Sequence, residues 1–508
     1  MSNISRERII ETAANLSNKA GLENLSLKMI AEELKIKSPS LYNHVSSLDD
    51  IKKQLISMVL HTNTLKNNLI SGTLLLTLTG ILSRIIGFYY KIFLSRTIGA
   101  EGLGIYQLIF PVFALIIAVS AAGIQTAISR YCAQCQIEQQ ARRYLVTGLV
   151  LSLLLSGICI AFVQTYAPWI GSVLLEDART VSLLRLMTFS LPFACIHSCI
   201  NGYYFGKKKA AIPSISQLLE QLIRVAGVWL LIQILTEQGN LPSPEIAVWG
   251  ILFGEVTAAL YSVTMLLFSH EKNPTQASLS LPPESRSYLQ VLRELCTMTL
   301  PLTCNRILLS ICQSAEAILI PMKLRDFGYT NSDSLSVYGI LTGMVFSTIL
   351  FPCVLSNSLS VMLLPAISEA NSRNRMDLIK KAVQKTTQLC VILGLLCTLG
   401  FLLGGNWIGI HLFHNALAGL YVRTLSWICP FLFLATTLCS ILHGLGKPTL
   451  TMLINLSGAI LRIGFIFVGI PRIGLSAYLW GMLASQILIS GLALISLRKI
   501  PKLPKQSA

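Results

Sequence analysis

The chain has 508 residues, of which 53% are hydrophobic and only 12% are charged. A soluble globular protein carries roughly 25% charged residues, so this composition, with a mean hydropathy of +0.64, excludes a soluble fold for most of the chain. The formal net charge of +17 would suggest a nucleic-acid partner in a soluble protein. Its meaning here depends on where the basic residues stand.

The amino-terminal segment, about 65 residues long, lacks an apolar run of spanning length. The spacing of its apolar residues predicts an amphipathic helix over 5–20 and a short helix over 27–34 with Ser26 as its N-cap. Ser38 is expected to cap a third helix, and Ser47 has the capping-box spacing that opens a fourth. This order of short helices is a helix-turn-helix pattern.

Two motifs in this segment point to a known family: Ile30-Ala31-Glu32-Glu33-Leu34 and Ser38-Pro39-Ser40-Leu41-Tyr42-Asn43-His44-Val45. They resemble the DNA-binding domain of TetR-type regulators. The resemblance implies that the helix at 38–44 enters the major groove, with DNA contacts from Lys37, Ser38, Ser40, Tyr42 and His44. Three alternatives stay open: a membrane-tethered regulator, a cytoplasmic appendage that no longer binds DNA, and an assembly or gene-model artefact.

Apolar runs of about 20 residues or more follow, each long enough to cross the hydrocarbon core as a helix. Helices are expected because backbone groups in lipid must be satisfied within the segment, and the runs lack the alternation of a β-barrel. The first run is too long for a signal peptide and is expected to be an uncleaved span. About twelve spans are predicted: 69–93, 105–129, 144–167, 181–205, 212–235, 246–268, 296–321, 335–362, 383–404, 420–443, 449–470 and 474–497.

Basic residues concentrate in alternate loops between these spans. By the positive-inside rule, those loops face the cytoplasm, which predicts that both termini are cytoplasmic. Much of the net charge thus serves topology and needs no nucleic-acid partner. The basic loops and tail contain Arg130, Arg142, Arg143, Lys207, Lys208, Lys209, Lys272, Arg286, Arg293, Arg373, Arg375, Lys380, Lys381, Lys447, Arg498, Lys499, Lys502 and Lys505.

The membrane part repeats internally. Several residues recur with a displacement of 238 positions, namely Pro192, Phe193, Gly206, Lys209 and Arg224 as Pro430, Phe431, Gly444, Lys447 and Arg462. The recurring segments hold equivalent places in two six-helix halves, so the repeat is parallel. Paired bundles of this kind enclose a site near the bilayer midplane and alternate its access by rocking, which indicates a transporter.

The predicted fold is therefore an all-α polytopic membrane protein preceded by a small helix-turn-helix bundle. The predicted parts are a TetR-like helix-turn-helix domain at 1–65, a first six-helix bundle at 66–270, a cytoplasmic loop at 271–290, a second bundle at 291–498 and a basic cytoplasmic tail at 499–508.

Several motifs of the membrane part point to one group of transporters, including Ser83-Arg84-Ile85-Ile86-Gly87-Phe88 and Leu364-Pro365-Ala366-Ile367-Ser368-Glu369-Ala370. Together they resemble the stage V sporulation protein B group of polysaccharide transporters, over roughly residues 66–500. That group belongs to the multidrug/oligosaccharidyl-lipid/polysaccharide superfamily, which includes the lipid II flippases. The resemblance implies an undecaprenyl-linked saccharide or peptidoglycan precursor as cargo, in sporulation or cell-envelope synthesis.

A flippase for a lipid diphosphate needs fixed positive charge in its cavity, and arginine makes bidentate contacts to phosphate. Charged residues at span depth are costly and are normally turned inward and used. The predicted cavity residues are Arg84, Arg224, Arg306 and Arg462, and the possible coupling carboxylates are Glu220, Glu255 and Glu316. The alternatives are structural: Glu220 and Arg224 have the spacing of an ion pair on one helix, and Arg224 and Arg462 could snorkel to headgroups.

Two rival functions remain. A multidrug or cation antiporter of the same superfamily would have a cavity dominated by carboxylates, and a membrane-tethered transcription regulator would use the spans as sensor and anchor. No enzyme is predicted, because the sequence has no nucleophile–base set, Walker loop or metal cluster. No cofactor or metal is expected either, since the Cys132–Cys135 pair has no second pair or nearby histidine. The predicted partners are a lipid-linked saccharide and the membrane lipids.

Overall fold

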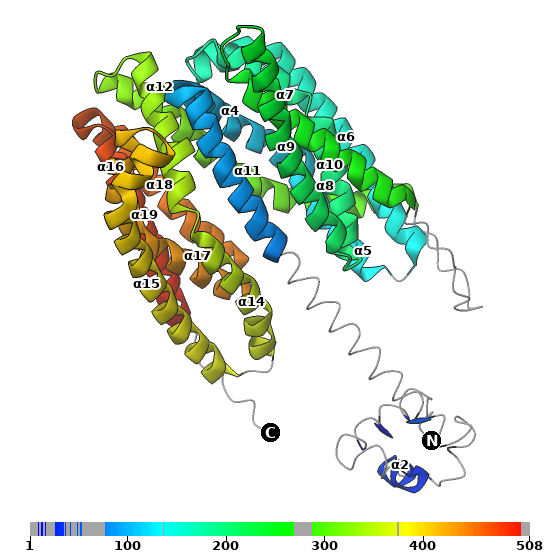
Figure 1. The fold of residues 1–508 in the computed structure, drawn as a ribbon. Helices are drawn as coiled ribbons and strands as arrows, with labels where there is room; N and C mark the ends of the chain where they lie inside the picture. Colours follow the sequence, from blue (N-terminus) through cyan, green and yellow to red (C-terminus); the bar gives the residue numbers. More distant parts are fainter. Residues whose placement is uncertain are drawn as a thin grey trace. The chain divides into compact units, whose positions relative to one another are not determined.

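The computed structural model describes residues 77–135, 137–268, 287–372 and 375–498, and in the amino-terminal part residues 9, 12, 13, 16, 26–34, 36, 41, 48, 51 and 52. The chain divides into two compact units, Met1–Leu75 and Leu76–Ala508. Figure 1 shows the ribbon of both units. Each unit is described by itself.

In the first unit, the short helix α2 spans Leu27–Glu33. The Ser26 hydroxyl accepts a hydrogen bond from the Met29 backbone N–H at 3.3 Å, so the predicted N-cap is confirmed. A small core surrounds this helix and contains Ile9, Ala13, Ile30, Ala31, Leu41 and Ile51. The predicted DNA-contacting residues Lys37, Ser38, Ser40, Tyr42 and His44 lie outside the described residues.

In the second unit, the first bundle begins with a helix over 77–97. The elements that follow are α4 (Gly99–Ile117), a π-helical segment (Ala118–Ala122), α5 (Gly123–Gln134), α6 (Glu138–Trp169), a π-helical segment (Ile170–Leu174), α7 (Thr180–Thr188), α8 (Leu191–Gly206), α9 (Ala211–Glu237) and α10 (Glu245–Phe268).

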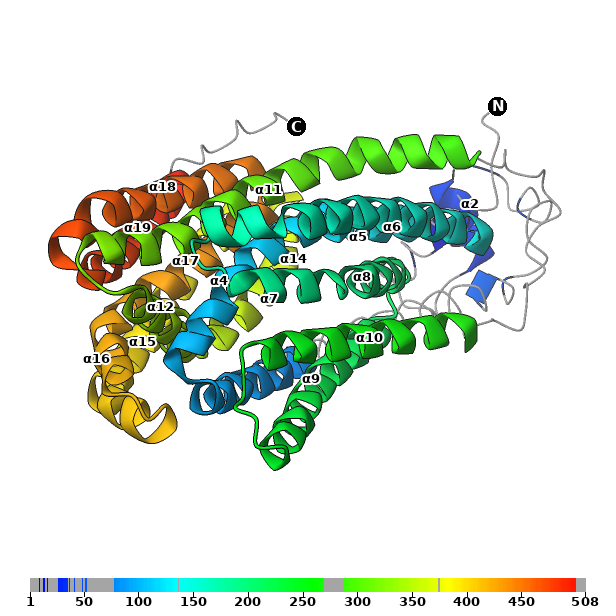
Figure 2. The same ribbon diagram turned by 90° about the horizontal axis from the view of Figure 1, so that it is seen from above.

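The second bundle begins with the long helix α11 (Tyr288–Asp326), which packs along α18 (Figure 2). The other elements are α12 (Asn331–Gly339), a π-helical segment (Ile340–Val345), α13 (Phe346–Ile349), α14 (Cys353–Ser372), α15 (Met376–Trp407), a π-helical segment (Ile408–Leu412), α16 (Ala416–Leu425), a 3₁₀ segment (Ser426–Ile428), α17 (Cys429–Gly444), α18 (Pro448–Ile473) and α19 (Leu475–Arg498).

Helix bounds repeat with the displacement seen in the sequence. Each bound of α15 stands 238 positions after the corresponding bound of α6, and the same holds for α17 and α8. The π-helical segments that follow α6 and α15 are also displaced by 238 positions. The two halves therefore share their local geometry as well as their sequence pattern.

Within the described ranges, nine helices are long and apolar enough to cross a membrane, and α7 with α8, bent by 45°, would make a tenth. The remaining two predicted spans correspond to 77–97 and to the path from α12 to α14. The predicted span over 335–362 is interrupted, because turn residues occupy 350–352. Pro352 explains the break, since proline disfavours helical geometry in the residue before it and cannot donate a backbone hydrogen bond.

Exposed apolar side chains follow one face of α6 and of α15. Leu154, Ile158 and Phe162 are each more than half exposed on α6, as are Ile392 and Leu396 on α15. Contiguous apolar surface of this extent would not be stable in water, whereas it suits helices surrounded by lipid.

The two bundles contact each other where α4 crosses α12 (Figure 1). A Cβ atom on Gly104 would overlap the Leu335 carbonyl oxygen, and one on Gly339 would overlap that of Ala100, so both positions require glycine. Near this crossing, the Arg96 guanidinium donates to the carbonyl oxygens of Leu412 (2.8 Å) and His411 (2.6 Å). These contacts join the first bundle to the second at one end of the unit.

Candidate functional site

One face of the helix over 77–97 carries two basic residues and is turned toward the second bundle. Arg84, Gly87, Phe88 and Lys91 have the spacing i, i+3, i+4 and i+7, which puts them on the same side of a helix. All four line a cavity of about 450 Å³. The sequence predicted the arginine of this face but not the lysine, although the seven-residue spacing was visible.

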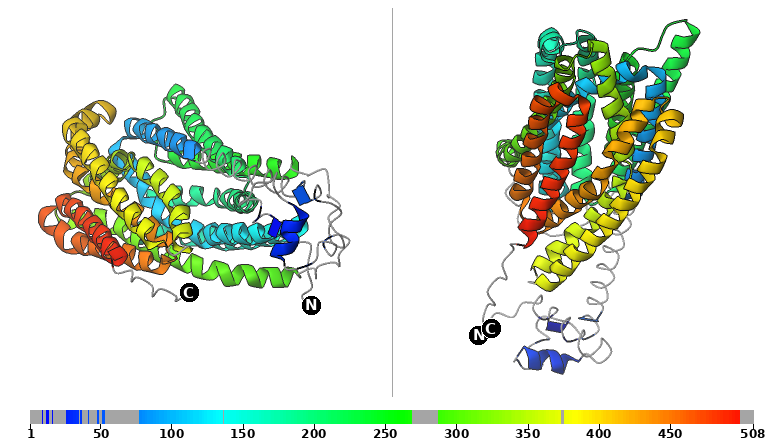
Figure 3. Two further views of the ribbon diagram at one scale, coloured as in Figure 1. Left: turned by 90° about the horizontal axis from the view of Figure 1, so that it is seen from below. Right: turned by 90° about the vertical axis from the view of Figure 1, so that its left-hand side faces the viewer.

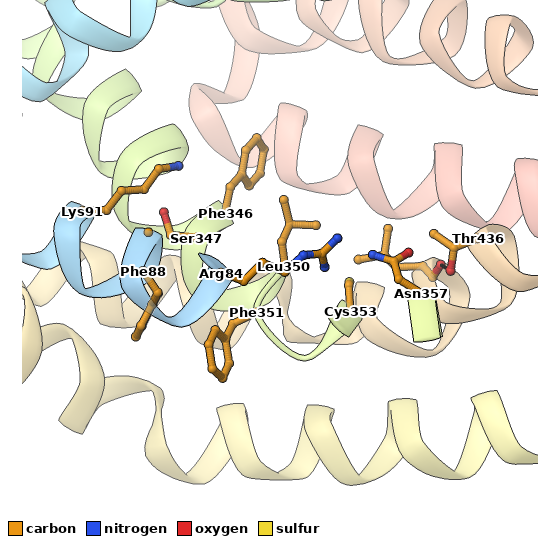
Figure 4. A pocket seen from close by; sticks show the side chains of 12 residues that line it. Arg84, Phe88, Lys91, Phe346, Ser347, Leu350, Phe351, Cys353, Asn357 and Thr436 are labelled. Atoms are coloured by element: carbon orange, nitrogen blue, oxygen red, sulfur yellow. Dashed lines mark hydrogen bonds between the residues drawn. The ribbon is translucent and has the colours of Figure 1, made fainter. Parts of the chain in front are cut away.

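The opposite wall of this cavity comes from the second bundle. Its residues lie around the break between α13 and α14, on α14 itself and on α17, and they are Phe346, Ser347, Leu350, Phe351, Cys353, Asn357, Leu432 and Thr436. Figure 4 shows the Arg84 guanidinium directed toward Asn357, and the Lys91 amine on the side of Phe346. Neither Asn357 nor Thr436 was predicted, because nothing in a single sequence indicates which helices contact each other.

Among the described residues, no carboxylate lines this cavity, so the charged side chains in its lining are all positive. Among the described residues, neither Arg84 nor Lys91 has an ion-pair or hydrogen-bond partner. Uncharged hydrogen-bonding groups come from Asn357, Ser347 and Thr436. A cavity with two unpaired cations and three neutral polar groups suits an anion that also carries hydroxyl or amide groups.

Arg224 lies elsewhere, in a polar cluster inside the first bundle. Its guanidinium forms an ion pair with Glu220 one turn earlier on α9, as the i, i+4 spacing predicted. On α10, a Glu255 carboxylate oxygen is 3.7 Å from Nδ1 of His197, whose Nε2 is 2.6 Å from the Asn201 amide nitrogen. Arg224 Nε and Glu255 Oε2 are buried without a hydrogen-bond partner. The sequence did not indicate His197, since a lone histidine in an apolar helix has no distinctive spacing.

Arg462 on α18 contacts a carboxylate and a hydroxyl group of neighbouring helices. Its Nη2 is 2.7 Å from Glu316 Oε1, and its Nε donates to both carboxylate oxygens of Glu316 on α11, at 2.9 and 3.0 Å. The Tyr478 hydroxyl donates to Glu316 Oε2 at 3.2 Å, and Arg462 Nη1 reaches the Ser485 hydroxyl at 3.5 Å. This cation and its carboxylate are therefore matched one to one.

The four predicted arginines are thus not brought together. Only Arg84 lines the cavity between the bundles, whereas Arg224 and Arg462 each pair with a carboxylate inside one bundle. Arg306 on α11 is exposed, does not line that cavity, and has no ion-pair or hydrogen-bond partner among the described residues.

Comparison with known proteins shows the family of this chain. A family model described as polysaccharide biosynthesis protein matches residues 69–370, more than half of the chain. The chain belongs to this family. A second model, MatE, matches residues 326–468 of this family member.

Curated relatives cover most of the chain. Stage V sporulation protein B of Bacillus subtilis is 25% identical over 435 residues, which are 85% of this chain and 83% of that protein. The lipid II flippase MurJ of the same bacterium is 21% identical over 423 residues, covering 78% of this chain and 77% of that protein. Both cover the membrane part of this family member, so the superfamily expected from the motifs is confirmed.

Solved structures show the same fold. An inward-facing multidrug MATE transporter of the MOP superfamily superposes with a TM-score of 0.64 at 17% identity, covering 83% of this chain and 94% of that one. The amino-terminal unit has a different relative: a 50-residue stretch is 42% identical to an uncharacterized HTH-type regulator of Mycobacterium tuberculosis, covering 10% of this chain and 23% of that protein.

Proposed function

We propose that this chain is a flippase that moves a lipid-linked saccharide, or a peptidoglycan precursor, with a diphosphate in its headgroup. The observation that supports this best is the pair of cations Arg84 and Lys91, which have no partner and share their cavity with no carboxylate within the part of the chain that the structure describes. A diphosphate would bind to the two cations, and the saccharide to Asn357, Ser347 and Thr436. The relatives named for polysaccharide, sporulation and lipid II transport support the same class of cargo.

Direction and topology belong to the same proposal. With both termini in the cytoplasm, the end that carries Arg142, Lys207 and Lys447 faces the inner leaflet. The crossing of α4 with α12 then closes the outer end, and the cargo enters the cavity from the inner leaflet. Rocking of the two bundles about this cavity would release the cargo to the outer leaflet.

Energy coupling is proposed for the cluster around Glu255. Glu220, Glu255, Arg224 and His197 lie close enough to interact electrostatically. Two carboxylates and one arginine leave one negative charge, which a proton on the histidine or a carboxylate would neutralise. Protonation of this cluster is thus a means to bias the bundles between their two positions. Glu316 forms an ion pair with Arg462, so we assign it a structural role instead.

The test is a reconstituted flipping assay with the full chain in proteoliposomes. Labelled undecaprenyl diphosphate sugars are compared with small cationic dyes. The proposal expects transbilayer movement of the anionic lipid and none of the dyes above empty liposomes. Dye export without lipid flipping would support the antiporter of the same superfamily instead.

The amino-terminal unit requires a separate test, because its DNA contacts at Lys37, Ser38, Ser40, Tyr42 and His44 remain predictions. Salt-dependent binding of the detergent-purified full chain to specific duplex DNA would support a tethered regulator, since phosphate contacts weaken with salt. Absence of binding at low salt would leave the unit as an appendage.

A further inference from the structure

A second cavity, of about 390 Å³, lies away from Arg84 between α15 and α19. Both helices pack on α17 and reach the same end of the bundle (Figure 3). One wall carries Lys380, Gln384 and Gln388 from α15, and the other carries Arg498 beside Leu494 from α19. Of the described residues, none lines both this cavity and the one that holds Arg84.

The polar residues on α15 form a ladder along one helix face. Lys380, Gln384 and Gln388 have the spacing i, i+4 and i+8, and they extend over about 12 Å of the helix axis at 1.5 Å per residue. All three are exposed, and within the part of the chain that the structure describes none has a hydrogen-bond or ion-pair partner. Gln384 and Gln388 lie within the predicted span 383–404, and Lys380 lies just before it. Because polar groups in a span are costly and normally functional, the two exposed amides point to a ligand.

The repeat shows that this ladder is not part of the shared fold. In α6, the positions that correspond to Gln384 and Gln388 hold Val146 and Val150, each 50% exposed. Apolar residues at these places are what a lipid-facing helix requires. The second half therefore carries two amides where the first half presents valines to the acyl chains.

The basic residue one turn before these amides, Lys380, also has a different environment from its counterpart in the first half. Arg142, which corresponds to Lys380, lies 3.5 Å from the carboxylate of Glu138. Met376 occupies the place of Glu138 in α15, and among the described residues Lys380 forms no ion pair with Asp377, the acidic residue three positions earlier on its helix.

The last described residue of the sixth helix also differs between the halves. It is Phe268 in α10, which is 85% exposed, and Arg498 in α19. Arg498, too, has no ion-pair or hydrogen-bond partner within the described ranges. The second half thus brings two unpaired cations and two amides to one groove at the membrane surface.

We propose that the groove between α15 and α19 binds the headgroup of an anionic phospholipid. The phosphate lies between Lys380 and Arg498, the glycerol oxygens accept hydrogen bonds from the amides of Gln384 and Gln388, and an acyl chain follows Leu494. Basic pockets between membrane helices recognise anionic headgroups in this manner. The proposal is independent of the proposed cargo, which occupies the other cavity.

The test is native mass spectrometry of the detergent-purified full chain, titrated with phosphatidylglycerol or with zwitterionic phosphatidylcholine. Wild type is expected to retain phosphatidylglycerol in preference to phosphatidylcholine. The double variant K380A/R498A is expected to bind phosphatidylglycerol about 30-fold more weakly, the effect of two basic groups at an anionic surface. The matched control is K385A, since Lys385 is an exposed lysine of the same helix that does not line the groove.

A second variant, Q384V/Q388V, gives α15 the residues of α6 and leaves every charge in place. It is expected to weaken phosphatidylglycerol binding severalfold without loss of folded protein. Equal binding of phosphatidylglycerol by wild type and K380A/R498A, or an equal loss in K385A, would overturn the proposal. Displacement of phosphatidylglycerol by a lower concentration of undecaprenyl diphosphate sugar would also overturn it, because the groove would then belong to the cargo path.

Discussion

Arg224 and Arg462 occupy equivalent places in the two bundles, 238 positions apart, but they are neutralised differently. Arg462 meets one carboxylate, Glu316, and every charge in that site is matched. Arg224 meets Glu220 on its own helix, with Glu255 and His197 close by. One site therefore joins two helices through a matched pair, whereas the other contains two carboxylates and one arginine, which is the basis of the coupling role that we propose for it.

The largest effect is expected from breaking the matched pair. Arg462→Ala leaves Glu316, only 8% exposed, without its cation, and loss of one partner of a buried pair costs about 3–5 kcal/mol. The thermal unfolding midpoint of the purified chain should fall sharply. The double variant R462M/E316L removes both charges and should recover most of the loss. If the double variant unfolds as early as the single one, the pair is not what stabilises this site.

A second variant introduces an additional carboxylate beside Arg462, whose charge is already neutralised by Glu316. Ser485 of α19 approaches Arg462 at 3.5 Å, so Ser485→Glu adds an acidic group where Arg462 already has one. Stability should fall at pH 8 by up to about 2.5 kcal/mol, the cost of an unpaired acidic residue at mid-membrane. At pH 5 the added group can take a proton, so the loss should be smaller. A loss equal at both pH values would mean that steric crowding, not charge, decides.

A third variant removes the additional carboxylate, Glu255, from the cluster around Arg224. Glu255→Gln leaves Arg224 paired with Glu220 alone, so the rate of flipping should lose its dependence on pH. The expected difference from wild type is about tenfold at the less favourable pH, with little change in thermal stability. The matched control is Glu220→Gln, which removes the direct partner of Arg224 and should lower stability as well. An unchanged pH profile in Glu255→Gln would remove the coupling role.

The smallest effect is expected at Arg306, which neither pairs with a carboxylate nor lines the cavity between the bundles. Arg306→Ala should change the flipping rate and the unfolding midpoint within about twofold and 0.5 kcal/mol, as substitutions at exposed positions usually do. This variant gives the baseline for removing an arginine from a span. A loss of transport as large as that of Arg84→Ala would indicate that Arg306 also binds the cargo.

Much of the architecture could be predicted from the sequence, because its evidence is periodic. Apolar runs of spanning length, basic loops on alternate sides and a displacement of 238 positions are all local patterns. The same holds for the Glu220–Arg224 pair, whose spacing on one helix is diagnostic. The π-helical segments were not predicted, since they do not change the apolar pattern.

The pairing between helices could not be predicted. Glu316 and Arg462 are 146 residues apart, and no pattern within either helix indicates that α11 packs on α18. For the same reason Asn357 and Thr436 were not expected beside Arg84. The sequence therefore indicated which charges were costly, and only the packing showed which of them were neutralised.

The central claim is that the unpaired Arg84 guanidinium binds an anionic headgroup. The most direct measurement is flipping of labelled undecaprenyl diphosphate sugar by wild type, Arg84→Ala and Arg84→Lys in proteoliposomes with equal amounts of folded protein. Arg84→Ala is expected to abolish flipping and Arg84→Lys to retain part of it, with unchanged membrane levels of both variants. Flipping by Arg84→Ala at the wild-type rate would show that this guanidinium does not bind the cargo.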